Sequence, residues 1–166
     1  MRTRNSLAYA LGRLTVFLVA STILGCASHT LPSQSMASED QAFPLRLDLR
    51  TNQPAYRLGE PVTLTLRATN PTPRQVSLTA PTSQLYDFSV YHGERQVWRW
   101  SAGKAFLMVI TELSIPAGQS RAFTEVWDQR DQEGRQVPPG EYRVVGNLVA
   151  AEQLGEKPLA TRIVIR

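Results

Sequence analysis

The feature that most constrains this chain is a strict alternation of apolar and polar residues that begins after residue 44. In the run LRLDLR, three leucines alternate with charged residues, and the same period returns in VTLTLRAT. A period of two places successive side chains on opposite faces of an extended strand. Each run therefore predicts a half-buried β-strand.

Similar runs follow along the chain and are separated by turn residues. They are RQVSLT, YDFSVYH, RQVWRW, FLMVITELSI, RAFTEVW, EYRVVGNLVA and ATRIVIR, divided by NPTP, HGE, PAG, DQEG and PPG. The divisions are rich in residues that favour tight turns. Because no stretch has the period of an amphipathic helix, the crossover helices of a parallel sheet have no place. We expect an all-β fold, an immunoglobulin-like antiparallel β-sandwich, over residues 44–166.

The N-terminal segment, residues 1–25, differs from the rest of the chain. It has three arginines, no acidic residue, and an apolar stretch of about eleven residues that ends just before Gly25. A helix needs roughly 20 residues to cross the hydrocarbon layer of a membrane. The segment therefore predicts a secretory signal peptide rather than a membrane span.

The tetrad ILGC at the end of this segment resembles the lipobox of bacterial lipoproteins, in which a lipid is attached to the cysteine and the chain is cut just before it. Cys26 is the only cysteine in the chain, so no intramolecular disulfide can form. We expect Cys26 to carry the lipid and hold the exported domain at the bacterial cell envelope, on the outer face of the inner membrane or on the outer membrane. An ordinary signal peptide cut near Ala27 is the alternative.

Residues 26–43 are small and polar without a regular period, which predicts a flexible tether. The whole chain has a net charge of +4, but three of its 18 basic residues lie in the signal segment. The rest of the chain then carries 15 basic and 14 acidic residues, a balance of +1. Its arginines are dispersed, so we expect no nucleic-acid partner.

Few residues offer catalytic or metal-binding chemistry. The two histidines are His29 and His92, so a Ser-His-Asp triad would have to use His92. The acidic residues of WDQRDQEG do not have the spacing of a calcium loop. Glycine motifs for nucleotide phosphates or a nucleophile elbow are missing as well. We expect a non-catalytic protein without a metal or a cofactor.

Trp98 and Trp100 are either a binding platform or part of the core. Two residues apart on a strand, they point to the same face. Exposed, the pair would stack on a sugar or a peptide, whereas buried rings would fill the space between two sheets. We favour the core.

The preceding strand, YDFSVY, is joined to the tryptophan strand by HGER, which predicts a hairpin. Tyr86, Phe88 and Val90 share one face of this strand, and Asp87 lies on the other. An isolated buried carboxylate is costly, so Asp87 is either exposed or hydrogen-bonded by neighbours such as Ser101. The sequence leaves both possibilities open.

Two segments resemble the BsuPI-type intracellular proteinase inhibitor domain: SQLYDFSVYHGERQVWRWSAGKAF and LSIPAGQSRAFTEVWDQRDQEGRQVPPGEYRVVGNL. The residues that carry the resemblance are Tyr86, Asp87, Phe88, Trp98, Trp100, Ser101, Phe106, Trp127, Gly140 and Tyr142. The resemblance implies an immunoglobulin-like sandwich and an inhibitor of a serine proteinase. Because the aromatics are spread over several segments, we interpret them as a shared core rather than a shared site.

We therefore expect a lipid-anchored domain that binds a protein, with a serine proteinase as the partner that the resemblance implies. An extended loop or an edge strand could enter the enzyme cleft. The candidate contact residues are arginines in turns, which suit an acidic specificity pocket: Arg74, Arg130 and Arg135. The alternative function is a structural or accessory module of the envelope that binds glycan or another envelope protein, and exposed tryptophans would favour it.

Overall fold

The computed structural model describes residues 43–166, so the predicted signal peptide, Cys26 and nearly all of the predicted tether lie outside the described residues. Ten strands and one short helix follow one another in the described part. They are β1 (Arg46–Thr51), β2 (Ala55–Tyr56), β3 (Val62–Thr69), β4 (Val76–Ala80), β5 (Tyr86–His92), β6 (Arg95–Arg99), β7 (Thr111–Ile115), β8 (Ser120–Trp127), β9 (Gly140–Leu148), α1 (Val149–Glu152) and β10 (Leu159–Ile165).

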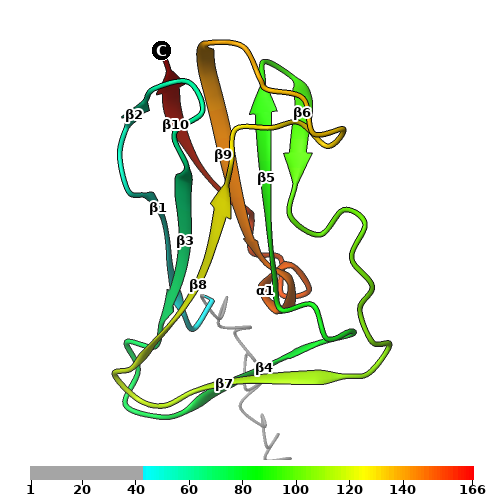
Figure 1. Ribbon diagram of the computed structural model, residues 1–166. Coiled ribbons are helices and arrows are strands. Elements are labelled where there is room, and N and C mark those ends of the chain that lie inside the picture. The colour runs from blue at the N-terminus through cyan, green and yellow to red at the C-terminus, as the bar shows by residue number, and fades with distance from the viewer. Residues whose placement is uncertain (1–42) are drawn as a thin grey trace, which may run out of the picture. The chain divides into compact units, whose positions relative to one another are not determined.

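The strands form three sheets (Figure 1). One has the order β1-β3-β8, a second has the order β2-β10-β9-β5-β6, and β4 pairs with β7 in a third. All pairs are antiparallel except the short parallel pair of β2 with β10. The three-stranded and five-stranded sheets face each other, and β4 and β7 cross one end (Figure 1). The predicted all-β sandwich is confirmed.

The core is built from alternate residues of the strands, as the period of two predicts. On β3, Val62, Leu64, Leu66 and Ala68 are fully buried, while the residues between them reach solvent to varying degrees. The same alternation runs along β9. Alternation gives each strand one apolar face and one face exposed to solvent. The hydrophobic effect therefore drives the two sheets together on their apolar faces.

Two strands are shorter than the apolar runs predict. FLMVITELSI forms a strand only from Thr111, and its residues 107–110 are exposed. EYRVVGNLVA leaves the sheet after Leu148, and a single helical turn then buries Ala150 and Ala151. The prediction of strands over these two full runs is therefore wrong. No helix among residues 43–166 is long and apolar enough to cross a membrane.

Candidate functional site

The aromatic residues singled out by sequence pack in two groups, of which the first surrounds Trp127. Trp98 on β6 lies 6.4 Å from Trp127, and Trp127 lies 5.7 Å from Tyr142 on β9, between ring centroids. Trp127 is fully buried, and its indole N–H donates to the Arg130 carbonyl at 2.8 Å. The Tyr142 hydroxyl donates to the Pro138 carbonyl at 2.5 Å. These contacts fix the start of β9 against the end of β8.

The second group of rings surrounds Tyr86 on β5. Its ring stacks on Trp100 at 4.4 Å and meets the fully buried Phe88 edge-on at 5.7 Å. Phe106 packs on Trp100 at 5.9 Å, and the Lys104 ammonium lies 3.9 Å from the centroid of the same indole ring. Trp98 and Trp100 are half-buried against the core, so neighbouring side chains cover much of the pair that could have formed a platform.

His92, the residue on which a catalytic triad would depend, packs as an aromatic ring. It stacks on Tyr142 with 4.8 Å between ring centroids. It also lies against Gly140, where a Cβ atom would stand 3.0 Å from His92 Nε2. A Cβ atom at position 140 would therefore require the His92 ring to shift. Within the described part of the chain, no three His, Cys, Asp or Glu side chains are grouped to hold a metal ion.

Asp87 is buried, with 3% of its surface exposed, and it is hydrogen-bonded. Its carboxylate accepts from Arg99 Nε at 2.7 Å and from the Ser101 hydroxyl at 2.6 Å. The backbone N–H groups of Phe88 and Ser101 also donate to it, at 2.9 and 3.2 Å. Of the two possibilities that the sequence left open, the structure shows the buried one. Arg99 is a partner that sequence reasoning missed, although it stands between the two tryptophans.

The side chains of the three arginines proposed as contact residues differ in the contacts that they make within the domain. Arg74 is exposed, and no ion pair within residues 43–166 includes it. Arg130 donates to the Gly134 carbonyl at 2.7 Å. Arg135 pairs with Asp131 and Glu133, each at 2.8 Å.

The ion pair of Arg135 with Asp131 also shifts the pKa of both side chains. Burial by itself raises the pKa of the Asp131 carboxyl, but the Arg135 N–H, the Arg135 guanidinium with its charge, and the Glu133 N–H together lower it below its usual value. The Asp131 hydrogen bond and charge in turn raise the pKa of Arg135. Arg135 could enter an enzyme's acidic pocket only by leaving two carboxylates of its own loop.

A buried glutamine, which sequence reasoning missed, joins this loop to the turn before β3. Gln129 is fully buried and has a left-handed backbone, with φ of 59°. Its amide donates to the carbonyls of Arg57 and Glu60, at 2.9 and 2.6 Å, and accepts from the Gly59 N–H at 2.8 Å. Only the fold brings these two loops together, so no sequence signal could have found the contact.

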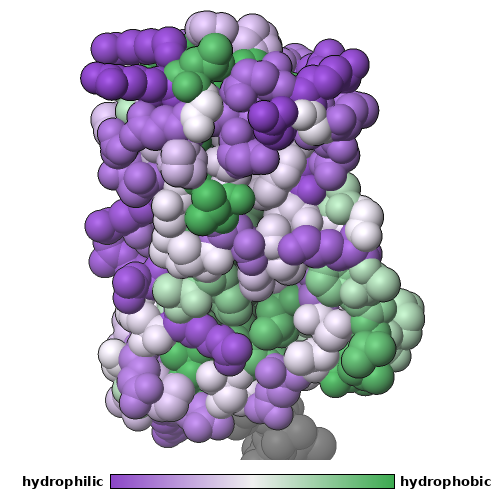
Figure 2. All heavy atoms as spheres, in the orientation of Figure 1, coloured by the Kyte–Doolittle hydropathy of each residue, from purple (hydrophilic) through white to green (hydrophobic). Residues whose placement is uncertain are grey.

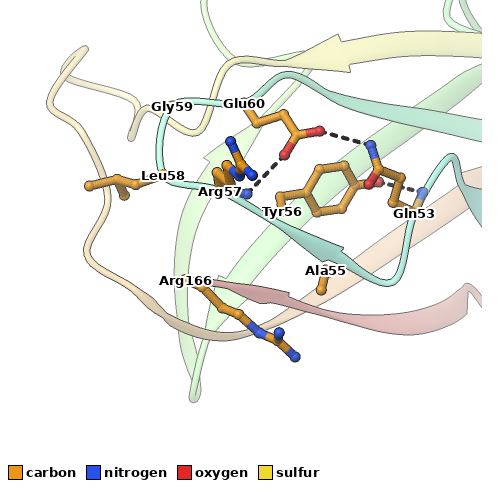
Figure 3. Close-up of a pocket in the computed structure, with 8 residues that line it drawn as sticks. All are labelled: Gln53, Ala55, Tyr56, Arg57, Leu58, Gly59, Glu60 and Arg166. Atoms are coloured by element: carbon orange, nitrogen blue, oxygen red, sulfur yellow. Dashed lines mark hydrogen bonds between the residues drawn. The ribbon is translucent and has the colours of Figure 1, made fainter.

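The turn that Gln129 holds borders an open hollow (Figure 3). Its lining includes Gln53, Tyr56, Arg57, Glu60 and Arg166. Glu60 accepts from the Arg57 N–H at 2.9 Å and from Gln53 Nε2 at 2.8 Å. These two hydrogen bonds lower the pKa of the Glu60 carboxyl. The Glu60 carboxylate and the Gln53 amide of the hollow are thus used in holding the turn itself.

The segment Leu107–Ile110, between β6 and β7, is the one place in the described part of the chain where exposed large apolar side chains are consecutive. Four large apolar side chains in a row are exposed there: Leu107 by 69%, Met108 by 85%, Val109 by 51% and Ile110 by 80%. Figure 2 shows an apolar patch at the lower right, where Figure 1 places the chain between β6 and β7. An exposed run of this kind disfavours solubility and usually marks an interaction site. We call it the apolar segment.

Two contacts hold the ends of the apolar segment to the same neighbouring stretch of chain. Leu107 donates its N–H to the Ser83 hydroxyl, and its carbonyl accepts from the Ser83 N–H, both at 2.9 Å. At the other end, Thr111 pairs with Ala80 at the start of β7. Three residues, 108–110, therefore stand opposite two, 81–82. Like a β-bulge, this mismatch pushes the longer side outward.

The sequence contained a signal for the apolar segment that the strand prediction overlooked. FLMVI is a run of five apolar residues without alternation. A strand at the surface of a sandwich alternates, and only a strand buried on both faces is continuously apolar. The short β4 offers partners only to Thr111–Ile115, so the preceding residues have no strand to pair with.

A protein-family model described as "BsuPI: Intracellular proteinase inhibitor" matches residues 49–153. No curated protein sequence matches the chain. The matched range contains both aromatic groups, the Asp87 cluster and the apolar segment.

Solved structures with a similar arrangement include three enzymes. The alkylpurine DNA glycosylase AlkC of Pseudomonas fluorescens, bound to DNA containing an abasic site analog, is 16% identical with a TM-score of 0.46, over 74% of this chain and 30% of that one. A β-glucosidase of Listeria innocua in complex with laminaribiose is 13% identical, with a TM-score of 0.43, over 74% and 16%. A cycloisomaltooligosaccharide glucanotransferase of Paenibacillus is 18% identical, with a TM-score of 0.45, over 70% and 13%. The chain spans less than a third of each, and likenesses this weak do not bear on its function.

Proposed function

The chain belongs to the BsuPI family of intracellular proteinase inhibitors, and from this membership we propose that it binds a proteinase and blocks the enzyme's cleft with the apolar segment. The exposure of Leu107–Ile110 carries the proposal. Binding in a cleft would remove four large apolar side chains from water, at a gain of roughly 1.5–3 kcal/mol for each one fully buried. The domain would act by binding, without catalysis of its own.

The apolar segment is a better candidate than the arginine loops. Arg130 and Arg135 are engaged in contacts within their own loop, and these contacts would have to break before either side chain could fill a pocket. Arg74 remains available, and it is the natural comparison in an experiment. The alternative role as a glycan-binding envelope module would use Trp98 and Trp100, whose rings pack against the core.

An inhibition assay tests the proposal. The full chain, purified in mild detergent, is titrated against a panel of serine proteinases with chromogenic peptide substrates. We expect at least one enzyme to be slowed at micromolar concentrations. Replacing all four residues 107–110 by serine should abolish the effect, while Arg74→Ala should leave it unchanged.

Two results would contradict the proposal. One is that no proteinase in the panel is slowed, and the other is that the four-serine variant inhibits as well as the parent. Thermal unfolding of each variant serves as the control, because a variant with an unchanged melting temperature has lost only its contact with the enzyme. If Arg74→Ala alone weakens inhibition, the contact lies in the arginine loop instead.

We also propose that the chain is exported and anchored through a lipid on Cys26, which is supported by the ILGC tetrad after a short apolar run. Each buried methylene of an acyl chain contributes about 0.8 kcal/mol to membrane binding, so two or three chains would anchor the protein firmly. Radiolabelled palmitate should be incorporated into the parent and not into Cys26→Ser. Labelling of both, or of neither, would refute the anchor. Fractionation of the bacterial envelope would then show which membrane holds the protein.

A further inference from the structure

In the described part of the chain, the N–H groups of residues 108–110 in the apolar segment are left to form hydrogen bonds with a partner. Within residues 43–166, no hydrogen bond is made by the N–H groups of Met108, Val109 or Ile110. The Val109 carbonyl accepts one bond, from the Thr111 hydroxyl at 3.2 Å. An exposed stretch with unpaired main-chain groups can add to a partner as an extra strand.

These unpaired groups also decide between two kinds of partner. A lipid bilayer would accept the apolar side chains, but in its hydrocarbon core each unpaired N–H costs several kcal/mol because no acceptor is available. An enzyme cleft that binds extended peptides supplies both apolar pockets and main-chain partners. The chemistry of the segment therefore favours a protein cleft.

The ends of the segment are fixed before binding, and this reduces the entropy lost on binding. Leu107 is held by the two hydrogen bonds to Ser83, and Thr111 is held by pairing with Ala80. Phe106, just before the segment, packs on Trp100. A segment fixed at both ends loses less conformational freedom than a free peptide of the same sequence.

Met108 is the side chain best placed to fill a pocket. It is the most exposed of the four and follows directly after the residue held by Ser83. Its unbranched side chain fits irregular apolar space, whereas Val109 and Ile110 are stiff near the backbone. No residue from 105 to 111 is charged. An acidic pocket would lose its water on binding and gain no cation in return.

We propose that Met108 enters the specificity pocket of the bound proteinase, that this pocket is apolar, and that residues 108–110 pair with the enzyme's main chain. The inference rests on the proposed function, and it names the class of enzyme: one that cleaves after large apolar residues. It replaces the expectation, drawn from arginines in turns, of an enzyme with an acidic pocket.

Substitution of Met108 tests the inference with two enzymes of known preference. Chymotrypsin prefers apolar side chains and trypsin prefers basic ones. The parent chain should inhibit chymotrypsin and not trypsin. Met108→Ala should raise the inhibition constant for chymotrypsin about 10- to 100-fold. The Met108→Arg variant should no longer inhibit chymotrypsin and should inhibit trypsin instead. Val126→Ala is the matched control, because Val126 is an apolar side chain on β8, outside the segment, that is 58% exposed; the expected change is less than about threefold.

The outcomes separate this inference from the function on which it rests. If the parent inhibits an enzyme while all Met108 variants inhibit it equally well, Met108 is not the pocket residue but the inhibitor function stands. Inhibition of trypsin and not chymotrypsin by the parent would also overturn the inference. If neither the parent nor any variant inhibits any proteinase, the proposed function fails as well. Binding to phosphatidylcholine vesicles that Met108→Arg abolishes would assign the segment to lipid and refute the inference.

Discussion

Asp87 links the stability of the sandwich to the position of the apolar segment. Its buried carboxylate accepts four hydrogen bonds, two of them from Ser101, where the chain leaves the β5–β6 hairpin toward the segment. Asp87→Ala would leave the Phe88 N–H and both Ser101 donors without an acceptor. At about 1 kcal/mol for each donor, the free energy of unfolding should fall by roughly 2–4 kcal/mol. The lost contact with Arg99 adds little to this fall, because the Arg99 side chain is 49% exposed and water can take the place of the Asp87 carboxylate as its hydrogen-bond acceptor.

Urea unfolding at pH 7 measures this loss, by linear extrapolation of the free energy of unfolding. With a slope of about 1–3 kcal/mol per molar urea, the midpoint should move down by about 1–2 M. Asp87→Asn keeps the shape of the side chain and one acceptor oxygen, so its free energy of unfolding should fall by about half as much as that of Asp87→Ala. Arg99→Met removes the exposed partner alone and should have a still smaller effect.

Two results would refute the reasoning about Asp87. The first is an Asp87→Ala variant within about 0.5 kcal/mol of the parent, since surface substitutions fall in that range. The second is an Arg99→Met variant that loses as much as Asp87→Ala, which would mean that the ion pair rather than the buried hydrogen bonds carries the stability.

Three further predictions follow from single contacts. Gly146→Ala should destabilise the domain by about 1–3 kcal/mol in urea unfolding, because its Cβ would lie 2.7 Å from Leu49 Cδ1 across the sandwich; the double variant with Leu49→Ala should then lose less than the two single losses added together. Gln129→Glu should cost about 2–3 kcal/mol by calorimetry, as much as Gln129→Ala, since a carboxylate cannot donate to two backbone carbonyls; parent-like stability would contradict this. Burial, together with a hydrogen bond to Glu125 and its charge, raises the pKa of Tyr86 well above its usual range, so absorbance at 295 nm should show Tyr86 still protonated at pH 11. The unfolded chain releases this proton near pH 10; stability should therefore fall as the pH rises above about 10, and Tyr86→Phe should remove that part of the fall.

The sequence by itself determined the fold class, the hairpin and most of the strands. Alternation along β3 and β9 is a local property, because each second residue faces the same side whatever the partner strand. The HGER turn likewise lies within a single short stretch, and β5 and β6 pair across it. The family also followed from sequence, since its motif residues are spread over the domain and their identity can be recognised without their positions in space.

Only the tertiary structure decided the surface and the buried polar contacts. Asp87 could have been exposed or buried until Arg99 and Ser101 were placed beside it. Gln129 meets a turn about 70 residues earlier in the chain. FLMVI looks like a buried strand, yet β4 is too short to pair with it, so Leu107–Ile110 stay exposed. The physical reason is common to all three: burial depends on which segments meet in space, and a local pattern does not contain that information.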